Sequence, residues 1–364
     1  MIKFPSVVRR EKSFQKEDGL QVCWEDSGEL KHFSAAELAT RYEDAYRPLN
    51  ATPMDDEWLA IYFAMLSFIE EEDVSLALGG PYDYLEKFKN VPKGQVNFWV
   101  KREAFEDPKK IVKNVTCQII PEAMAHTYGY VDKLEKDIIT ISIGFGTVEI
   151  AAGTQTRTIV RDSLSSINYG LHIASINFRK KLKNLGYDNP RISNNQVHFW
   201  DNLLMQVVDG NDPHLSRRTP QGRDKIDLNV LQCEAEKVLQ NYQLGLIEQL
   251  DFYFSHFSRP YQIIVTGGGC LYPQVKSALA QMFKKIGYKF LFAPAEVAKI
   301  SAAKGYEMLG KKMGREDTIG VDMGNHSTII TYQSNGDNDL AGKSSPINIQ
   351  PLVEKFSNQE QVIN

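Results

Sequence analysis

Short apolar stretches alternate with polar positions over residues 1–35, which is the period of strands with one buried face. This pattern predicts several short strands joined by turns at the start of the chain. Ser34 precedes Glu37 by three residues, the spacing of a capping box, and predicts a helix that runs toward Tyr46. The longest apolar run, residues 59–69, is too short to span a bilayer and predicts a buried helix.

Strands and helices are predicted to alternate along the rest of the chain. Strands are expected at residues 76–78, 97–100, 115–120, 138–143, 147–151, 262–266, 290–292, 318–322 and 328–332. Helices are expected at residues 58–69, 121–136, 170–183, 228–257, from 273 onward and at 295–312. Pro121 opens the second of these helices, where its missing N–H would lack a helical partner anyway. The polar stretch 209–225 contains glycines and prolines and predicts an exposed loop.

Size and charge narrow the class of protein. A chain of 364 residues corresponds to about two domains, and 42% hydrophobic and 24% charged residues are ordinary for a soluble globular protein. The net charge of −4 gives no strongly basic surface, so direct nucleic-acid binding is not expected. The N-terminus has no apolar signal-peptide core and the four cysteines are widely spaced. We therefore expect reduced thiols, no membrane partner and a cytoplasmic location.

Three glycine-containing turns follow strands that the pattern predicts to be buried. They lie at residues 322–328, 142–149 and 266–269. Glycine has no Cβ, so backbone N–H groups in such turns can approach phosphate oxygens closely. Asp322, at the end of its strand, offers a carboxylate suited to the water shell of a Mg²⁺ ion. In the third turn a strand ends in three glycines before a helix, so a ligand could lie against bare backbone.

A single turn of this kind more often has only a structural role, because glycine commonly punctuates turns. Likewise, Asp322 could simply stabilise its own turn, and Glu122 could favour the dipole at the start of its helix. Three such turns in two separate parts of the chain form a more specific pattern. Together they favour one binding site for a nucleotide.

These stretches resemble motifs of the superfamily that contains actins, heat-shock chaperone ATPases and sugar kinases. Asp322–Thr328 resembles the first phosphate-binding hairpin, Ile143–Glu149 the second, and Thr266–Gly269 the turn that faces adenosine. Ile120–Ala123 resembles the connecting segment that carries a catalytic Glu in ParM-like proteins, and residues 302–306 resemble the second connecting helix. The resemblance implies a two-domain, actin-like (ribonuclease H-like) α/β fold with a nucleotide cleft between the domains.

Further stretches resemble the ParM/StbA branch of plasmid-segregation actins. Residues 3–6 are similar to the Phe-Pro-Ser strand that follows the first phosphate hairpin in that branch, and residues 76–81 to a later strand. Here the Phe-Pro-Ser strand opens the chain and the hairpin comes last, which implies a circular permutation. The resemblance covers about residues 1–335. The domains it implies are residues 1–136 plus 303–335, residues 137–302, and a tail or extension at 336–364.

The resemblance also implies roles for single residues. Asp322 would hold Mg²⁺ through water, and Glu122 would orient the attacking water at the γ-phosphate of ATP or GTP. The nucleotide-binding residues that it implies are Asp322, Gly324, Asn325, Thr328, Gly144, Gly146, Thr147, Gly267, Gly268 and Gly269. Ser142 stands where the family has an Asp in the second phosphate motif. Because a hydroxyl holds the metal's water shell more weakly than a carboxylate, we expect slower hydrolysis more than weaker binding.

The implied function is a cytoplasmic ATPase or GTPase that assembles with itself into filaments when nucleotide is bound. In the family, such filaments move plasmid or other DNA through a DNA-bound adaptor protein. Ser142 motivates an alternative, a nucleotide-binding switch or scaffold with little or no hydrolysis. A small-molecule kinase is a third possibility, for which the chain shows no additional substrate-binding motif.

Overall fold

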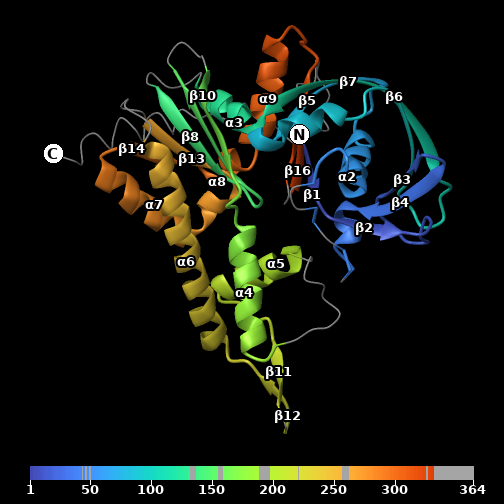
Figure 1. The fold of residues 1–364 in the computed structure, drawn as a ribbon. Coiled ribbons are helices and arrows are strands. Elements are labelled where there is room, and N and C mark those ends of the chain that lie inside the picture. The colour runs from blue at the N-terminus through green and yellow to red at the C-terminus, as the bar shows by residue number, and fades with distance from the viewer. Residues whose placement is uncertain are drawn as a thin grey trace.

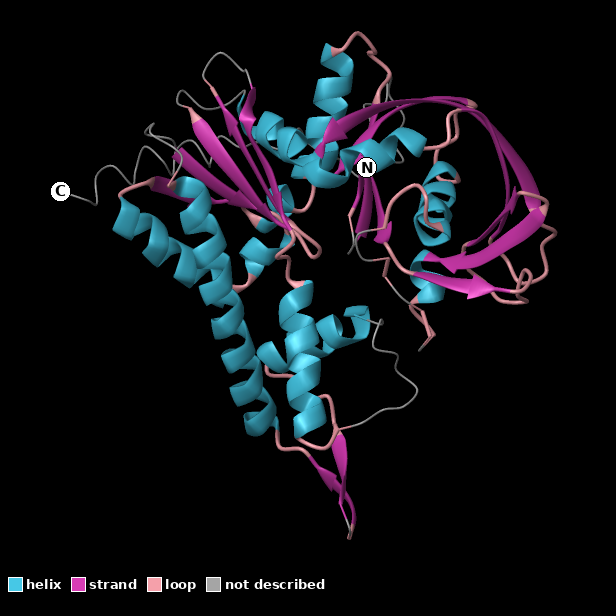
Figure 2. Cartoon of the chain, in the orientation of Figure 1, coloured by secondary structure: helices cyan, strands magenta, loops and turns pink. Residues whose placement is uncertain are grey.

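The computed structural model describes residues 1–42, 44–45, 47–48, 51–131, 137–154, 159–187, 197–219, 221–255, 262–324 and 327–331. Within these residues the chain forms two large mixed sheets with helices between and around them (Figures 1 and 2). The predicted α/β class is therefore confirmed.

The larger sheet combines strands from both ends of the described chain. Its strands are β1 (Ile2–Pro5), β2 (Val8–Glu11), β3 (Gln21–Asp26), β4 (Glu29–Ala35), β5 (Asp73–Gly80), β6 (Gly94–Lys101), β7 (Lys109–Pro121), β15 (Ile319–Met323) and β16 (Ser327–Thr331). Their spatial order is β1-β16-β15-β5-β7-β6-β3-β4-β2. Ile2 of β1 lies opposite Ile330 of β16, so the opening strand of the chain pairs with the last described strand.

The smaller sheet lies within the middle of the chain. Its strands are β8 (Ile138–Ile143), β9 (Val148–Gly153), β10 (Ile159–Ile167), β13 (Gln262–Thr266) and β14 (Lys289–Phe292), in the order β10-β9-β8-β13-β14. Strands β8, β9 and β13 are buried along their whole length. Their nearly continuous apolar sequences agree with burial on both faces.

Five strands of the larger sheet repeat the arrangement of the smaller one. In the smaller sheet β8, β9 and β10 form an antiparallel meander, and β13 and β14 follow in parallel beside β8. In the larger sheet β15, β16 and β1 form the same meander, and β5 and β7 follow in parallel beside β15. The two halves therefore share one strand order, except that the third meander strand of the larger sheet comes from the start of the chain.

Two helices lie between the sheets and pack on each other, α3 (Glu122–Val131) and α9 (Ser301–Lys312) (Figure 1). Helix α3 contacts β8, β9 and β10 and also β5 and β7, whereas α9 contacts β5, β15 and β16. Their close approach requires a glycine, because a Cβ built on Gly305 would lie 1.8 Å from the carbonyl oxygen of Ala125. These helices bring the strand ends of both sheets to one junction.

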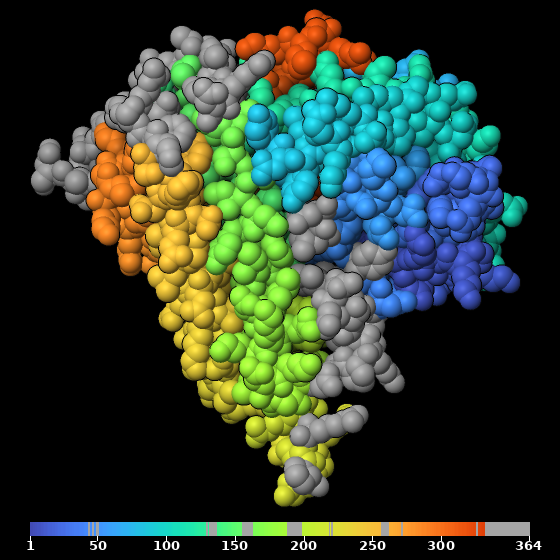
Figure 3. Space-filling view, viewed as in Figure 1, coloured from blue at the N-terminus to red at the C-terminus, as the bar shows by residue number. Residues whose placement is uncertain are grey.

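The remaining elements flank this frame. They are α1 (Ala36–Ala39), α2 (Asp56–Leu66), η1 (Tyr82–Asn90), α4 (His172–Asn184), α5 (Val197–Val208), β11 (Ser216–Thr219), β12 (Gly222–Lys225), α6 (Leu228–Phe254), η2 (Gly268–Leu271), α7 (Pro273–Ile286) and α8 (Ala295–Ala298). Helices α4, α5 and α6 form an arm that ends in the β11–β12 hairpin, which projects from the body of the molecule (Figures 1 and 3). Helix α6 buries a stripe that includes Leu231, Tyr242 and Leu250, as its helical period predicts.

The capping-box prediction at Ser34 is wrong. Ser34 lies in β4, and its hydroxyl donates a hydrogen bond of 2.9 Å to Glu11 Oε1 instead of capping a helix. Strand β4 is paired on both sides, with β2 and β3, and this pairing outweighs the local helical signal. The helix that follows, α1, has only four residues and has no side-chain cap. Tyr46, the expected helix end, lies outside the described residues.

Other element predictions need smaller corrections. The stretch 209–225 is not all loop, because it contains the β11–β12 hairpin. The helix expected at 295–312 is divided into α8 and α9 at Lys299 and Ile300. Pro121 ends strand β7 instead of opening α3. Strand β10 and helix α5 were not predicted.

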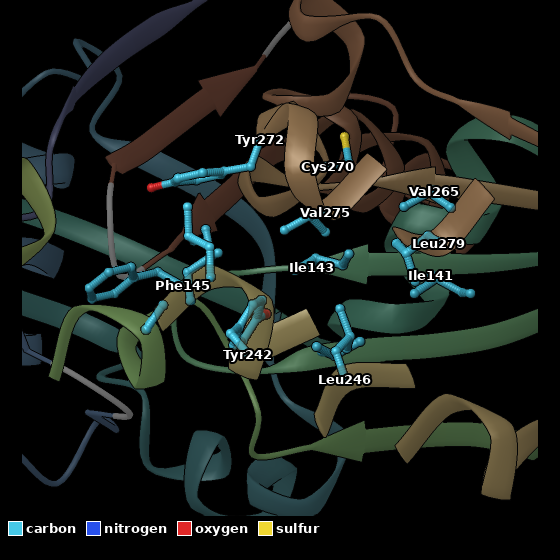
Figure 4. Packing of buried hydrophobic residues seen from close by; sticks show 14 of the residues in the cluster. Ile141, Ile143, Phe145, Tyr242, Leu246, Val265, Cys270, Tyr272, Val275 and Leu279 are labelled. Atoms are coloured by element: carbon cyan, nitrogen blue, oxygen red, sulfur yellow. The ribbon is translucent and has the colours of Figure 1, made fainter. Parts of the chain in front are cut away.

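The hydrophobic core is divided into two main clusters, one for each sheet. The cluster around the five-stranded sheet packs Ile141 and Val265 against Leu246 of α6 and Leu279 of α7 (Figure 4). Among the described residues, no helix is long and apolar enough to cross a membrane. All four cysteines are unpaired in the structure.

Candidate functional site

The second and third glycine turns lie side by side because their strands are neighbours. In the parallel pair β8–β13, Thr266 lies opposite Ser142. A Cβ added to Gly267, whose φ is +81°, would lie 2.6 Å from Ile143 O, and one added to Gly269 would lie 2.2 Å from Ile143 Cγ2. Side chains are therefore excluded at both positions. Gly268 has no atom within 4 Å of its Cβ position, so its backbone borders open space.

The carbonyl groups of the turn between β8 and β9 accept backbone hydrogen bonds. Gly144 N donates to Thr147 O at 2.8 Å and closes the turn. The backbone N–H groups at the start of α4 donate to the turn, with His172 N 2.9 Å from Phe145 O and Gly170 N 3.2 Å from Gly146 O. The turn predicted to hold phosphate is thus a rigid, close-packed structure.

The turn between β15 and β16 presents Asp322 on one face of its sheet. Asp322 lies opposite Ile329, and the turn continues through Gly324. Thr328 is fully buried and lies on the other face, where its hydroxyl is 3.0 Å from Ser6 Oγ. The Thr328 side chain therefore joins the turn to the opening strand, on the face of the sheet opposite to Asp322. Asn325 lies outside the described residues.

Glu122 begins α3 at the junction of the two sheets, and its neighbour one turn along the helix is His126. Glu122 Oε1 lies 3.5 Å from His126 Nε2, and the same nitrogen lies 2.9 Å from Ser142 Oγ at the end of β8. His126 Nδ1 lies 2.7 Å from Ser301 Oγ, the first residue of α9. The imidazole is 4% exposed, so water does not compete for these hydrogen bonds.

The hydrogen-bond network extends from His126 to the third glycine turn. Ser301 Oγ lies 3.2 Å from Thr266 Oγ1, which lies 3.1 Å from the Tyr130 hydroxyl. Ser301 also donates to Ala298 O at 3.3 Å. One buried chain of polar groups therefore links both inter-sheet helices to the ends of β8 and β13.

Glu149 lies beside these residues, although the sequence analysis did not name it as a candidate. It lies opposite Ser142 in the β8–β9 pair and is 1% exposed. Burial, with repulsion from Glu122 as the second cause, raises the pKa of the Glu149 carboxyl to about 8. Ser166 Oγ donates to Glu149 Oε1 at 2.7 Å, but Glu149 Oε2 has no hydrogen-bond partner among the described residues.

Asp322, Glu122 and Glu149 form a group of acidic side chains from both halves of the molecule, in which Glu122 interacts with each of the other two. Burial raises the pKa of Asp322 well above its usual value, repulsion from Glu122 adds to the rise, and Lys3 opposes it. All three carboxylates also raise the pKa of the Tyr306 hydroxyl, after burial as the largest cause. Carboxylates that repel one another in a buried site are stabilised by a cation.

These carboxylates fit a hydrated magnesium ion better than a directly bound one. In the described part of the chain, no three His, Cys, Asp or Glu side chains converge closely enough to ligate a metal together. Mg²⁺ usually keeps several waters and takes one or two carboxylates plus substrate phosphates. Asp322 as a group that holds the metal through water agrees with this chemistry.

The structure thus brings the predicted residues into two neighbouring groups. Gly144, Gly146, Thr147 and residues 267–269 lie together at the ends of β8 and β13, and Asp322 belongs to the second group. Glu122 connects the two, because it interacts electrostatically with Asp322 and contacts His126, which is hydrogen-bonded to Ser142. The signal for Glu149 was a single acidic residue in an otherwise apolar strand. His126 had no sequence signal, because its role depends on contacts with three separate elements.

No protein-family model and no curated protein matches this sequence. Among solved structures, an archaeal actin homologue is 15% identical over 85% of this chain and 92% of its own, with a TM-score of 0.61. A 15-stranded ParM filament from Clostridium botulinum is 14% identical over 85% of this chain and 92% of that chain, with a TM-score of 0.59. ParM from Bacillus thuringiensis with AMPPNP is 13% identical over 86% and 92%, with a TM-score of 0.53.

At such low identity these similarities establish the fold. The chain has an actin-like fold, which confirms the expected two-part α/β architecture. Because archaeal actin and ParM proteins match it about equally well, the likeness does not distinguish between branches of actin-like proteins.

Proposed function

We propose that this protein binds ATP or GTP with Mg²⁺ at the junction of its two sheets. The observation that carries the proposal is the convergence there of Asp322, Glu122 and Glu149 from β15, α3 and β9. Glu122 repels both of the other carboxylates, and such a group beside glycine turns favours a site for a cation and polyphosphate. Similar structures include ParM with AMPPNP, which supports nucleotide as the ligand.

In this proposal the chain mainly positions groups. Asp322 holds the hydrated metal, and the backbone around Gly144, Gly146, Thr147 and Gly324 approaches the phosphates, with Asn325 and Thr328 proposed to lie near them. Gly267, Gly268 and Gly269 face the nucleoside. Mg²⁺, when bound, neutralises charge on the phosphate oxygens. Glu122 orients a water molecule toward the terminal phosphate, and His126 fixes the carboxylate of Glu122 from one turn along the helix.

Hydrolysis is proposed to be slow, because Ser142 supplies a hydroxyl where a carboxylate would hold the metal's waters more strongly. The Ser142 hydroxyl is also engaged with His126 at 2.9 Å. This observation favours the second candidate function, a switch or scaffold that binds nucleotide with little turnover. Phosphate release from wild type and Ser142→Asp distinguishes them. Near-zero turnover in wild type that rises in the variant supports the switch, whereas turnover of about 1 s⁻¹ or more in wild type supports the ATPase or GTPase.

Self-assembly into filaments is proposed as the consequence of nucleotide binding, with a role in plasmid or other DNA segregation through a DNA-bound adaptor in the cytoplasm. A filament of ParM among the similar structures supports the self-assembly. Sedimentation of the purified chain with Mg²⁺ and either nucleotide tests it. We expect pelleting only with the triphosphate. Equal pelleting with and without nucleotide, or none at high protein concentration, contradicts it.

We also propose that the chain is a circularly permuted member of the ParM/StbA branch. The shared strand order of the two sheets supports the permutation, because only the larger sheet takes its third meander strand from the start of the chain. The proposed domains keep the expected bounds, residues 1–136 plus 303–335, residues 137–302, and residues 336–364 as a tail or extension.

A further inference from the structure

Arg47 is a buried cation that bridges the two halves of the molecule and has unused hydrogen-bonding capacity. Its side chain is 6% exposed, its Nη1 lies 3.4 Å from Asp201 Oδ2 in α5, and its Nε has no hydrogen-bond partner among the described residues. A charge-assisted N–H···O bond is normally about 2.7–2.9 Å long, so this ion pair is loose. A buried guanidinium with a loose partner and a free donor is suited to a second anion.

The loose pair is costly to bury. Burial lowers the pKa of Arg47 and raises that of Asp201, although each opposes the shift of the other. Ser175 Oγ also donates to Asp201 Oδ1 at 3.2 Å, so Asp201 shares its charge with a second partner. Asp201 therefore leaves part of the hydrogen-bonding capacity of the Arg47 guanidinium unused among the described residues.

Arg47 lies next to both phosphate-type turns. Its guanidinium carbon is 5.9 Å from the centre of the Phe145 ring, which belongs to the turn after β8. Figure 4 shows the Phe145 ring at the same edge of the core as Tyr272, whose hydroxyl interacts electrostatically with Arg47 and Asp201. Arg47 also lines a cavity of about 310 Å³ with Ser327, the first residue after the turn that follows β15.

The cavity has a positive lining. Its described lining residues are Lys3, Phe4, Pro5, Thr40, Arg47 and Ser327, of which the only charged ones are basic. Lys3 occupies the same row of the sheet as Asp322, because both lie opposite Ile329. Lys299 repels Lys3 and Asp322 attracts it, so the Lys3 ammonium has one further cation and one carboxylate as charged neighbours.

We propose that Arg47 and Lys3 bind the terminal phosphate of the nucleoside triphosphate, and so distinguish triphosphate from diphosphate. The inference deepens the proposed function and depends on it. A guanidinium offers parallel N–H donors that match a phosphate, and an ammonium adds a mobile point charge. Because Arg47 also pairs with Asp201 in the other half of the molecule, a phosphate that draws the guanidinium away from this loose ion pair is sensed by α5.

The test is the ratio of affinities for AMPPNP and ADP, each with Mg²⁺, measured by calorimetry on the full chain, with the guanine analogues in parallel. Losing charge-assisted bonds to one phosphate is expected to weaken triphosphate binding by about 10- to 100-fold in Arg47→Met, and less in Lys3→Met. ADP affinity is expected to change less than about threefold. Arg102→Met is the control, since Arg102 also lies over an aromatic ring, that of Phe68, and is not among the residues that line the cavity.

Asp201→Asn distinguishes phosphate binding by Arg47 from a purely structural role, in which the Arg47–Asp201 ion pair only holds the two halves of the molecule together; this second role is called the clasp below. If Arg47 binds phosphate, this variant frees the guanidinium and retains or strengthens triphosphate preference, whereas a clasp predicts equal weakening of both nucleotides in Arg47→Met and Asp201→Asn. Arg47→Lys, with its melting temperature recorded, covers the case in which Arg47→Met does not fold. A wild-type preference that survives in Arg47→Met overturns this inference and leaves the proposed function intact. If wild type binds no nucleotide, both are overturned.

Discussion

At the scale of single residues, the site depends on side chains that share one another's hydrogen bonds. His126 is surrounded by Glu122, Ser142 and Ser301, and its two nitrogens are both within hydrogen-bond distance of a hydroxyl. An Asp in place of Ser142 would add a third carboxylate beside Glu149 and Glu122, whereas the Ser142 hydroxyl pairs with His126. A neutral Ser142 held by a histidine therefore reduces the crowding of negative charge in this group.

We expect His126→Asn to lower the rate of nucleotide hydrolysis by roughly tenfold, with nucleotide affinity changed less than threefold, because Glu122 loses the group that orients it. Unpaired buried hydroxyls should also reduce the free energy of unfolding by about 1–3 kcal/mol. Single-turnover kinetics and urea denaturation measure the two effects. The control is His214→Asn, since the His214 side chain is 80% exposed. A loss of affinity with an unchanged rate would contradict the positioning role.

The raised pKa of Glu149 gives a pH dependence with a definite sign. Its carboxyl titrates near 8 in the folded chain and near 4.5 when free, so the folded state holds the proton more tightly. Its contribution to stability is complete below about pH 4.5 and is lost as the pH rises through about 8. Relative to wild type, Glu149→Gln should therefore gain free energy of unfolding across this range. Denaturation at several pH values measures this, with exposed Glu236→Gln as the control, and a pH-independent difference would refute it.

At the scale of elements, the sequence predicted those whose pattern is local and missed those decided by tertiary contacts. Strand β13 and the hairpin β8–β9 were predicted nearly to the residue, because continuous apolar runs end at glycines. Ser34 failed as a helix cap because β4 is paired on both sides. Glu122 was predicted, but its grouping with His126 and Glu149 was not, since that grouping depends on how α3 packs against the β8–β9 pair.

The close contact between α3 and α9 gives a prediction at this scale. Gly305→Ala should reduce the free energy of unfolding by about 1–3 kcal/mol, despite the better helix propensity of alanine, because the new Cβ would meet the carbonyl oxygen of Ala125. Gly268→Ala is the matched substitution. It has open space for its Cβ, so stability should change by less than about 0.5 kcal/mol while nucleotide affinity falls. Thermal denaturation that shows the reverse order would contradict this packing.

At the scale of the whole molecule, the order of strands can be tested by rejoining the chain. Thr331 of β16 and Ile2 of β1 belong to adjacent antiparallel strands, so a hairpin loop of about 2–5 residues could connect them. A chain that starts at Arg315, runs to Thr331, and continues through such a loop into residues 2–314 should fold with a similar melting temperature and keep its nucleotide affinity. Failure to fold with several loop lengths would argue against equivalent halves.

The central claim is that nucleotide binds where the two sheets meet, and a crystal structure of the chain with Mg²⁺ and AMPPNP tests it most directly. We expect the phosphates between the turns that follow β8 and β15, the metal's waters near Asp322, and the nucleoside against Gly268. Nucleotide bound elsewhere on the molecule, or no bound nucleotide after soaking at millimolar concentration, would contradict the claim.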